Sequence, residues 1–407
     1  MKKNKLKNII SLRMPAGYSK LIHGTVIVLS LFGVLMVTSA TMGKVSVGKT
    51  LFAGGKELFF VCVGYFMMVF FARRFSFNYF KKYLVVITLA VIGSLLLTMF
   101  FSSAGGASAW IRFGQVTIQP SEFAKVYMVL LIAVSLGDKH KVRVASGIDL
   151  VKRPVLVLLT IILIVTVLQR DLGSAAVILA ISLLCFLIPS QRKLSKLQKW
   201  VLILLVVGVF TLIFLDTPTG LKIAETIFSK LGIPEYMFKR FESAANPFLD
   251  RYNEGYQLFM GLAAMVQGLQ AGPFGKGFTN SDNKFGYLPE AQTDFIIAII
   301  VEELGILGIL IVVISYGVIL FNLYKYAILA RFEAEKIVLI GAASYFAIHF
   351  ILNIGGATGL IPLTGVPLIL VSAGGSSRMA AMIMIGLAQN IISRTNSSQR
   401  QKAVQST

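Results

Sequence analysis

Apolar runs of membrane-spanning length recur along almost the whole chain, and they limit its fold more than any other feature. Crossing the hydrocarbon core of a bilayer, about 30 Å thick, takes about 20 apolar residues, and only helices or closed barrels satisfy the backbone there. With 56% hydrophobic residues, the chain is predicted to be an all-α polytopic membrane protein with about ten transmembrane helices. The predicted spans lie at residues 21–40, 56–72, 83–101, 121–137, 154–169, 171–189, 199–215, 291–321, 337–353 and 374–393.

The excess of positive charge lies in alternate connections between these spans. If the N-terminus is cytoplasmic, the segments on that side are the two tails and the connections near 73–82, 138–153, 190–199 and 322–336, which together hold the chain's entire basic excess. Short cytoplasmic loops retain Lys and Arg, so both termini are predicted to be cytoplasmic. The net charge of +21 is then an orientation signal against anionic lipid, and nucleic acid is not expected as a partner.

One substantial polar insert, from Asp216 to Glu290, interrupts the apolar runs. The sequence predicts one membrane domain, residues 21–393, which includes this large extracellular loop (216–290) between spans seven and eight and is flanked by cytoplasmic tails at 1–20 and 394–407. The run at 21–40 is too long for a cleaved signal peptide and is interpreted as the first span. Cys62 and Cys185 lie inside apolar runs, which indicates neither a disulfide nor a metal site.

A polar stretch, ASAWIRFGQVTIQPSEFAK at residues 107–125, precedes the fourth span. Pro120 and Ser121 indicate a helix start, with Glu122 in the first turn pairing at i,i+3 with Lys125. Two interpretations are open. The stretch is a well-capped span with an interfacial Trp, or Arg112 and Lys125 present cations to a phosphate at the outer head-group level.

The short turn LQRDLGSA, residues 168–175, joins the fifth and sixth spans near the outer interface. Arg170 and Asp171 could pair with each other or contact a ligand there. Asp171 could equally serve as the acid at the start of the sixth span.

The large loop contains an apolar run at residues 258–266, too short to cross a bilayer, which predicts a short amphipathic or re-entrant helix at the outer interface. Gln257 and Lys276 are candidates for contact with a sugar or a phosphate. The glycines of GPFGKGF resemble a phosphate-binding loop, but the complete Walker pattern and a preceding strand are missing. Nucleotide binding is therefore rejected, and no organic cofactor is expected.

Asp294 stands at the junction between the polar loop and the apolar eighth span. It is either an acid that stabilises a helix N-terminus or a carboxylate tuned as a base between a wet and a lipid-like side. A continuous helix would place Glu302 and Glu303 roughly 12 Å deeper, close to the middle of the membrane. Acids at that depth face the bundle interior, so these two are predicted to form a structural polar network, to which Glu122 and Asp171 are also assigned.

The stretch from Asn353 to Ser377, NIGGATGLIPLTGVPLILVSAGGSS, is too rich in Gly, Pro, Ser and Thr for a continuous lipid-facing helix. Such backbone must line a cavity or be covered by protein. It suggests a groove open to the outer face, with Ser376 and Ser377 as candidate substrate contacts.

Four stretches in this order, IQPSEFAK, LPEAQTDF followed by EELG, TGLIPLTGVPL and GGSS, resemble the SEDS family of shape, elongation, division and sporulation proteins, best known as FtsW and RodA. The resemblance covers nearly the entire chain, from the first predicted span to the tenth. NPFLDRYNEGYQL and YLPEA are more similar to the division branch, FtsW, than to the elongation branch, RodA.

This resemblance implies a peptidoglycan glycosyltransferase of the cell membrane and division septum, which polymerises lipid II into glycan strands on the outer face. The acid of the family's TDF motif, Asp294 here, is implied to be the catalytic general base that deprotonates the acceptor sugar hydroxyl. The implied partners are lipid II and the nascent glycan strand, a class B penicillin-binding transpeptidase, other division proteins and membrane lipid.

A single carboxylate suffices for this reaction because a lipid diphosphate leaves as a stabilised anion, which needs positive charge rather than a second acid. Lys125 and Arg112 are the first choice for that charge. Arg170, Arg251 or a divalent cation, Mg²⁺ or Mn²⁺, could also supply it, although the sequence identifies no metal ligands.

Three residues depart from the family pattern. Gln292 stands where His is common before TD, Arg170 where Pro is common, and Ala373 where Tyr is common before GGSS. None of the three removes the proposed base. The alternatives to a division-type polymerase are an elongation-type polymerase, a lipid II flippase or other transporter, and a scaffold without enzymatic activity.

Overall fold

The computed structural model describes residues 12–42, 46–101, 107–114, 116–137, 146–215, 217–230, 238–239, 242, 252 and 255–405. A helix lies at each predicted span. By length and composition alone, six of the described helices could cross a membrane, so the count of ten spans stays a prediction. The helices at the predicted spans are α2 (Lys20–Thr41), α3 (Val47–Arg74), α5 (Leu84–Leu97) with η1 (Thr98–Phe100), α6 (Pro120–Leu136), α8 (Gly147–Leu163) with the π-helical η2 (Ile164–Leu168), α9 (Leu172–Leu187), α10 (Ser195–Leu215), α14 (Ile296–Leu329), α15 (Glu333–Thr358) and α16 (Gly375–Gln405).

Shorter elements fill the connections. They are α4 (Phe77–Lys82), η3 (Arg192–Leu194), α11 (Pro218–Lys230), α13 (Tyr256–Gln270), and the strands β1 (Ile111–Phe113) and β2 (Val116–Ile118). The short helix predicted around residues 258–266 is confirmed as α13. The antiparallel pairing of β1 with β2, in which Arg112 faces Thr117, was not predicted.

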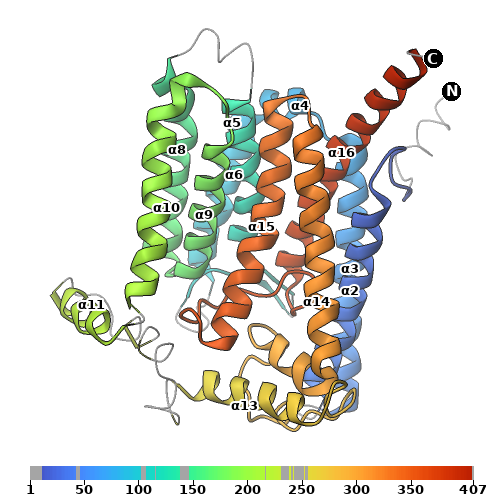
Figure 1. The fold of residues 1–407 in the computed structure, drawn as a ribbon, viewed down its shortest axis with the longest axis vertical. Coiled ribbons are helices and arrows are strands. Elements are labelled where there is room, and N and C mark those ends of the chain that lie inside the picture. The colour runs from blue at the N-terminus through green and yellow to red at the C-terminus, as the bar shows by residue number, and fades with distance from the viewer. Residues whose placement is uncertain are drawn as a thin grey trace.

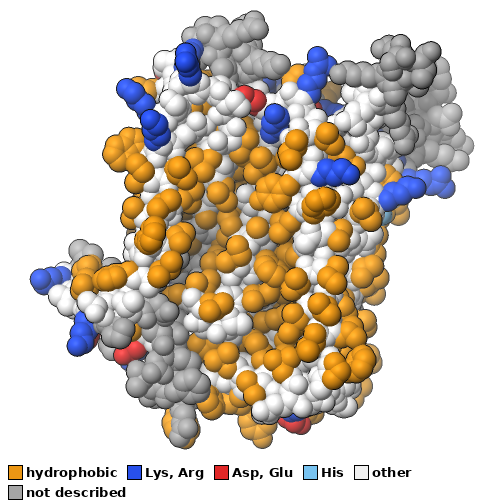
Figure 2. Space-filling model, in the orientation of Figure 1, with side chains coloured by type: hydrophobic (Ala, Val, Ile, Leu, Met, Phe, Trp, Pro, Cys, Tyr) orange, Lys and Arg blue, Asp and Glu red, His pale blue; other side chains and the backbone are white. Residues whose placement is uncertain are grey.

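The long helices lie side by side, with α4 and the far end of α16 at one end of the bundle and α11 and α13 at the other (Figure 1). Most of the Lys and Arg side chains visible in Figure 2 gather at the α4 end, and hydrophobic side chains cover the flank between the two ends. We call these the basic end, which carries Arg73, Arg74, Lys81 and Lys82, and the loop end, which carries α11 and α13.

Helix α6 forms the centre of the bundle. All but one of its residues are buried, because α5, α8, α9, α15 and α16 pack around it. A helix that is apolar on every side belongs in such a position. Its N-terminus, at the loop end, is held to the start of α9, where Ser121 Oγ lies 3.3 Å from Ser174 Oγ.

Helix α14 reverses direction at Gly305, whose φ of 58° and ψ of −140° are not helical. Glycine adopts this conformation far more readily than other residues. A Cβ on Gly308 would lie 2.6 Å from Cγ2 of Ile300, whereas residues eight apart in a straight helix are about 12 Å apart. The helix therefore consists of a short arm, residues 296–304, folded back on a long arm, residues 306–329.

The glycine-rich loop after α13 packs into this reversal. Lys276 N and Gly277 N donate to the carbonyl oxygens of Glu302 and Glu303, both over 2.9 Å. A Cβ on Gly275 would lie 2.6 Å from the backbone nitrogen of the residue at the reversal. In this fold, the GPFGKG glycines thus allow close backbone packing that satisfies carbonyl groups freed by the broken helix.

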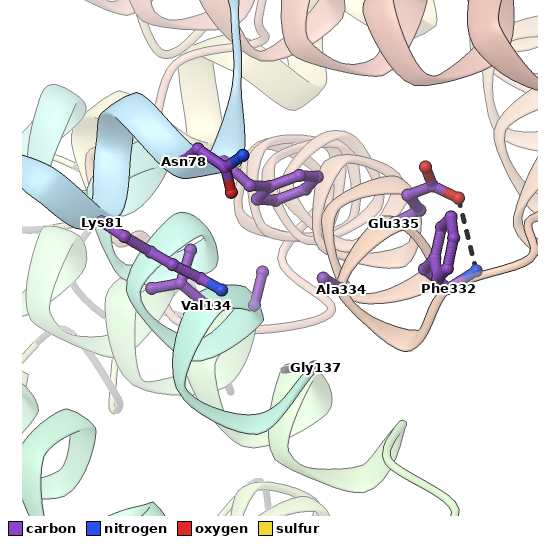
Figure 3. A pocket seen from close by; sticks show the side chains of 9 residues that line it. Asn78, Lys81, Val134, Gly137, Phe332, Ala334 and Glu335 are labelled. Atoms are coloured by element: carbon purple, nitrogen blue, oxygen red, sulfur yellow. Dashed lines mark hydrogen bonds between the residues drawn. The ribbon is translucent and has the colours of Figure 1, made fainter. Parts of the chain in front are cut away.

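A cavity of about 330 Å³ lies at the basic end, between α4, α6 and the start of α15 (Figure 3). No residue that the sequence predicted to contact substrate lines it. It is lined by Phe77, Asn78, Lys81, Ala133, Val134, Gly137, Phe332, Ala334 and Glu335.

Candidate functional site

Asp294 lies just before the short arm of α14, where separate parts of the chain meet. Its carbonyl oxygen accepts a hydrogen bond from Nδ2 of Asn353 on α15, over 2.9 Å. Its carboxylate lies beside Gly365, where a Cβ would come within 3.6 Å of Asp294 Oδ2. Asp294 is half-buried and Gly365 is exposed, so the carboxylate stands at an accessible edge of the protein.

The segment between α15 and α16 forms that edge. It contains no helix or strand, and its residues 368–372 are buried, which confirms that this backbone is covered by protein. Ser372 Oγ donates to Thr293 O over 2.7 Å, and Ala373 N donates to Gln292 O over 2.8 Å. The second bond joins Ala373 and Gln292, two of the residues that depart from the family pattern, so these two departures are neighbours in space.

The start of α9, which follows a short turn, packs against the same segment. A Cβ on Gly173 would lie 2.3 Å from the carbonyl oxygen of Thr364, which immediately precedes Gly365. Arg170 is exposed in this turn and has a φ of 56°. Proline cannot adopt that φ, so the turn of this chain has a conformation that the more common family residue could not form.

Asp171 acts as the acid at the start of α9. Its Oδ1 accepts from Ser174 N over 3.0 Å, and its Oδ2 accepts from Gln119 Nε2 over 2.8 Å. No ion pair joins Asp171 to Arg170 in the structure as described. The helix-start interpretation of Asp171 is therefore confirmed, and it leaves the Arg170 guanidinium at the surface.

Lys125 and Glu122 form the predicted i,i+3 pair, with Nζ 2.7 Å from Glu122 Oε1. Lys125 is only 1% exposed, and its Nζ also lies 3.2 Å from His349 Nε2. The other nitrogen of His349, Nδ1, lies 3.3 Å from Pro367 O. A lysine only donates and a carbonyl only accepts, so this imidazole is neutral with its proton on Nδ1.

Glu302 binds the glycine-rich loop. Its Oε1 accepts from Lys276 Nζ and Asn283 Nδ2, each over 2.9 Å, and its Oε2 accepts from Ser281 Oγ over 2.5 Å. Burial lowers the pKa of Lys276, but its hydrogen bonds and ion pairs with Asp282 and Glu302 outweigh this effect and raise the pKa above 10.5. Lys276 is therefore a cation at neutral pH, and it already pairs with protein carboxylates.

Glu303 and Lys284 form a second ion pair beside the first. Lys284 Nζ lies 3.0 Å from Glu303 Oε1, and Ser39 Oγ of α2 donates to the same oxygen over 2.6 Å. Lys284 Nζ also donates to the carbonyl oxygen of Thr279. Buried acids with this many donors fit the predicted structural network.

Asp294 and the two glutamates lie at depths opposite to those predicted. Glu303 contacts Ser39, close to the loop end of α2, whereas a Cβ on Gly33 of α2 would lie 2.4 Å from Leu370 O, in the segment bonded to Thr293. Positions 33 and 39 of one helix are roughly 9 Å apart along its axis. The prediction that Glu302 and Glu303 lie deeper than Asp294 is wrong. The chain reverses at Gly305, after both glutamates, so the short arm runs toward the loop end and places them closer to that end than Asp294.

A buried ion pair that the sequence analysis missed supports the same segment. Arg378 Nη2 lies 3.3 Å from Glu57 Oε2 of α3 and donates to Ser372 O over 3.1 Å. Ser372 in turn holds Thr293, next to Asp294. An acid inside an apolar run, as in GGKELFFVCVG, was the available signal for this pair.

The polar face of α15 was also missed. Tyr345, His349 and Asn353 recur every four residues on an otherwise apolar helix, which places them on one side. All three contact the segment between α15 and α16 or the start of α16. Their four-residue spacing in the sequence was a signal of this polar face.

The remaining predicted contacts are more scattered. Ser376 and Ser377 are buried, and Ser377 Oγ donates to Gly374 O over 3.1 Å. Gln257 Nε2 donates to Pro289 O over 3.4 Å. Arg112 is half-buried in β1, whose partner strand β2 packs against α16. Arg251 lies outside the described residues.

Within the described ranges, no three His, Cys, Asp or Glu side chains come together to hold a metal ion. The residues around Asp294 therefore offer no all-protein metal cage, and a Mg²⁺ or Mn²⁺ ion there would need oxygen ligands from a substrate diphosphate.

Comparison with known proteins gives consistent matches. Residues 19–397 match the family model for FtsW, RodA and SpoVE, described as cell cycle protein. The chain is 30% identical over 386 residues to a probable peptidoglycan glycosyltransferase FtsW of Enterococcus hirae, with 92% of each protein covered. It is 31% identical over 363 residues to stage V sporulation protein E of Bacillus subtilis (strain 168), with 88% of this chain and 92% of that protein covered.

Among solved structures, the fold is similar to a chain from a peptidoglycan synthase complex that coordinates polymerization and crosslinking. The TM-score is 0.70 at 21% identity, and the match covers 93% of this chain and 98% of that one.

Proposed function

The chain belongs to the FtsW, RodA and SpoVE family of cell cycle proteins, and from this membership we propose that it is a peptidoglycan glycosyltransferase. It polymerises lipid II into glycan strands on the outer face of the cell membrane. The observation that carries the proposal is the Asp294 carboxylate, which lies at an accessible edge beside Gly365. The main chain that bears it is held by α15 and by the segment between α15 and α16.

Asp294 acts as the general base. It takes the proton from the acceptor sugar hydroxyl while that oxygen forms a bond to the anomeric carbon of the donor sugar. The bond from this carbon to the diphosphate breaks at the same time, and undecaprenyl diphosphate leaves with the electron pair. A second carboxyl group is not needed, because the diphosphate leaves without protonation.

Arg170 is the first candidate to bind the diphosphate. It is exposed, and its turn packs through Gly173 against the residue before Gly365. Lys125 was preferred on sequence grounds, but it is buried in its pair with Glu122, so contact with a phosphate would require the pair to open. Arg112 supplies a further cation from β1.

The distribution of charge orients the protein. Lys and Arg gather at the basic end, so this end is cytoplasmic and the loop end faces outward. Both termini are then cytoplasmic, and the loop containing α11 and α13 is extracellular. A class B penicillin-binding transpeptidase is the expected partner, together with other division proteins at the septum. Similarity to a chain of a peptidoglycan synthase complex supports such an assembly.

The test is polymerisation of labelled lipid II by the purified full-length chain in nanodiscs, with and without its transpeptidase partner. Wild type forms glycan strands, and Asp294→Ala and Asp294→Asn form none. Glu225→Gln, in α11, is the matched control for loss of an acid and polymerises normally. Lipid II flipping without polymer would replace the proposal with a transporter, and an active Asp294→Ala variant would remove the proposed base.

A further inference from the structure

Two buried polar atoms beside Asp294 have unused hydrogen-bonding capacity. They are Oδ1 of Asn353 and Oγ1 of Thr364, and neither has a hydrogen-bond partner among the described residues. Leaving a buried polar atom unpaired costs about 1–3 kcal/mol, so folded proteins contain few of them, and each calls for an explanation. Here two occur next to the proposed base.

The orientation of the Asn353 amide is fixed by chemistry. Its Nδ2 donates to Asp294 O over 2.9 Å and to Val366 O over 3.0 Å. Both partners are carbonyl oxygens, which only accept, so a flipped amide would set oxygen against oxygen. Oδ1 is thus the free end of a side chain that is 3% exposed, and it can be satisfied only by an O–H or N–H group from elsewhere.

Thr364 lies between the two elements that border the base. Its carbonyl oxygen packs against Gly173 of the α9 turn, and the next residue, Gly365, is exposed and approaches the Asp294 carboxylate. A hydroxyl group can both donate and accept. The two unpaired atoms therefore belong to segments that meet at Asp294, one bonded to its backbone carbonyl and the other leading into the residue beside its carboxylate.

We propose that Asn353 Oδ1 and Thr364 Oγ1 form a sugar subsite that binds hydroxyl or acetamido N–H groups of the acceptor saccharide and so presents its reacting hydroxyl to Asp294. This subsite rests on the proposed glycosyltransferase function. A polyhydroxylated acetamido sugar offers the O–H and N–H donors that a buried carboxamide oxygen requires. Asn353 has a second role as a positioning residue, because its nitrogen holds the Asp294 backbone.

Thr364→Val is the decisive variant, because it removes the hydroxyl and keeps the shape of the side chain. We expect KM for lipid II to rise roughly three- to tenfold, with kcat little changed and the unfolding temperature equal to or above that of wild type. Thr364→Ser restores the hydroxyl and returns KM toward the wild-type value. Asn353→Leu raises KM and also lowers kcat, because it removes the support of Asp294.

Binding of labelled lipid II to Asp294→Asn protein in nanodiscs, which does not turn over, separates the subsite from catalysis. Weaker lipid II binding after Thr364→Val is added to Asp294→Asn supports the subsite. If the wild type bound lipid II in this way but did not polymerise it, only the glycosyltransferase proposal would fail. Unchanged binding and unchanged KM would mean that the two atoms hold only water, which overturns the subsite. The subsite would also be overturned if Thr364→Val lowered the unfolding temperature without changing KM and Thr364→Ser restored that temperature. Such a result would show that the hydroxyl serves the fold and not the substrate.

Discussion

Nδ2 of Asn353 bonds to the carbonyl oxygens of both Asp294 and Val366, over 2.9 Å and 3.0 Å. One amide group on α15 thereby joins the chain that enters the short arm of α14 to the segment that leads into α16. The position of the proposed base is set by main-chain contacts, so residues that do not touch the carboxylate can still control it.

The reversal at Gly305 is expected to tolerate no other residue. In Gly305→Ala, the Cβ would be strained at a φ of 58° and would lie 2.6 Å from Gly275 N. The strain alone costs on the order of 1–3 kcal/mol, so the unfolding temperature of the purified protein falls and polymerisation is lost. Gly317→Ala, in the long arm with open space around it, is the control and is at least as stable as wild type. Equal stability of the two variants would contradict the reversal.

Substitutions at Arg170 should separate turn geometry from charge. Arg170→Gly suits a φ of 56°, and its stability stays within about 1 kcal/mol of wild type, because relief of the left-handed conformation offsets the greater entropy of glycine in the unfolded chain. Its kcat/KM for lipid II falls by roughly tenfold or more, since a charge-assisted bond to phosphate is lost. Arg170→Pro cannot adopt this φ and is destabilised by more than about 1 kcal/mol.

Full activity in Arg170→Gly would instead assign the diphosphate to another cation, and Arg112→Gln is the next variant to assay. Thermal unfolding and initial rates of polymerisation, measured on the same preparations, distinguish these outcomes.

The Glu57–Arg378 pair should show strong coupling. Both side chains are buried and 3.3 Å apart, so Glu57→Gln or Arg378→Gln leaves an uncompensated charge and destabilises the protein by about 3–5 kcal/mol. The double variant Glu57→Gln/Arg378→Gln removes both charges and recovers much of that loss. A thermodynamic cycle from chemical unfolding measures the coupling, and additive single effects would mean that the two residues act independently.

Lys276 should contribute stability that depends on pH only in the alkaline range. Its folded-state pKa is raised above 10.5, so its ion pairs stabilise the protein fully below the unfolded-state pKa, and this contribution is lost as the pH rises through the folded-state pKa. The stability difference between wild type and Lys276→Met is therefore constant from about pH 7 to about pH 9 and shrinks above the unfolded-state pKa. A stability difference between wild type and Lys276→Met that grew with pH would contradict the raised pKa of Lys276.

Hydropathy was sufficient to locate the helices, because a span of lipid-facing residues leaves a continuous apolar signal. The same signal hid the reversal of α14. Its short arm is almost entirely buried and, apart from Glu302 and Glu303, is as apolar as the long arm. Gly305 is the residue in the sequence that distinguishes a hairpin from a straight span. That one residue reverses the order of depth of Asp294 and Glu303.

The polar partners of the site were predictable in part. Glu122 and Lys125 lie within one turn of helix, and their pairing follows from local spacing. Asn353 and Asp294 are far apart in sequence, and their contact depends on the tertiary return of the chain between α15 and α16. Arg170 was identified by its charge, but its left-handed backbone, with a φ of 56°, has no signal in the local sequence.

The fold-back of the short arm also bears on how a membrane-tethered substrate reaches the reaction centre. A polyprenyl tail keeps its diphosphate at head-group depth, and a base fixed to the outermost turn of the protein would sit above that plane. Because the chain doubles back, the short arm holds Asp294 away from the loop end, whereas Glu303 contacts Ser39 close to that end. Under the proposed function, the carbohydrate meets the base while the isoprenoid remains among the acyl chains.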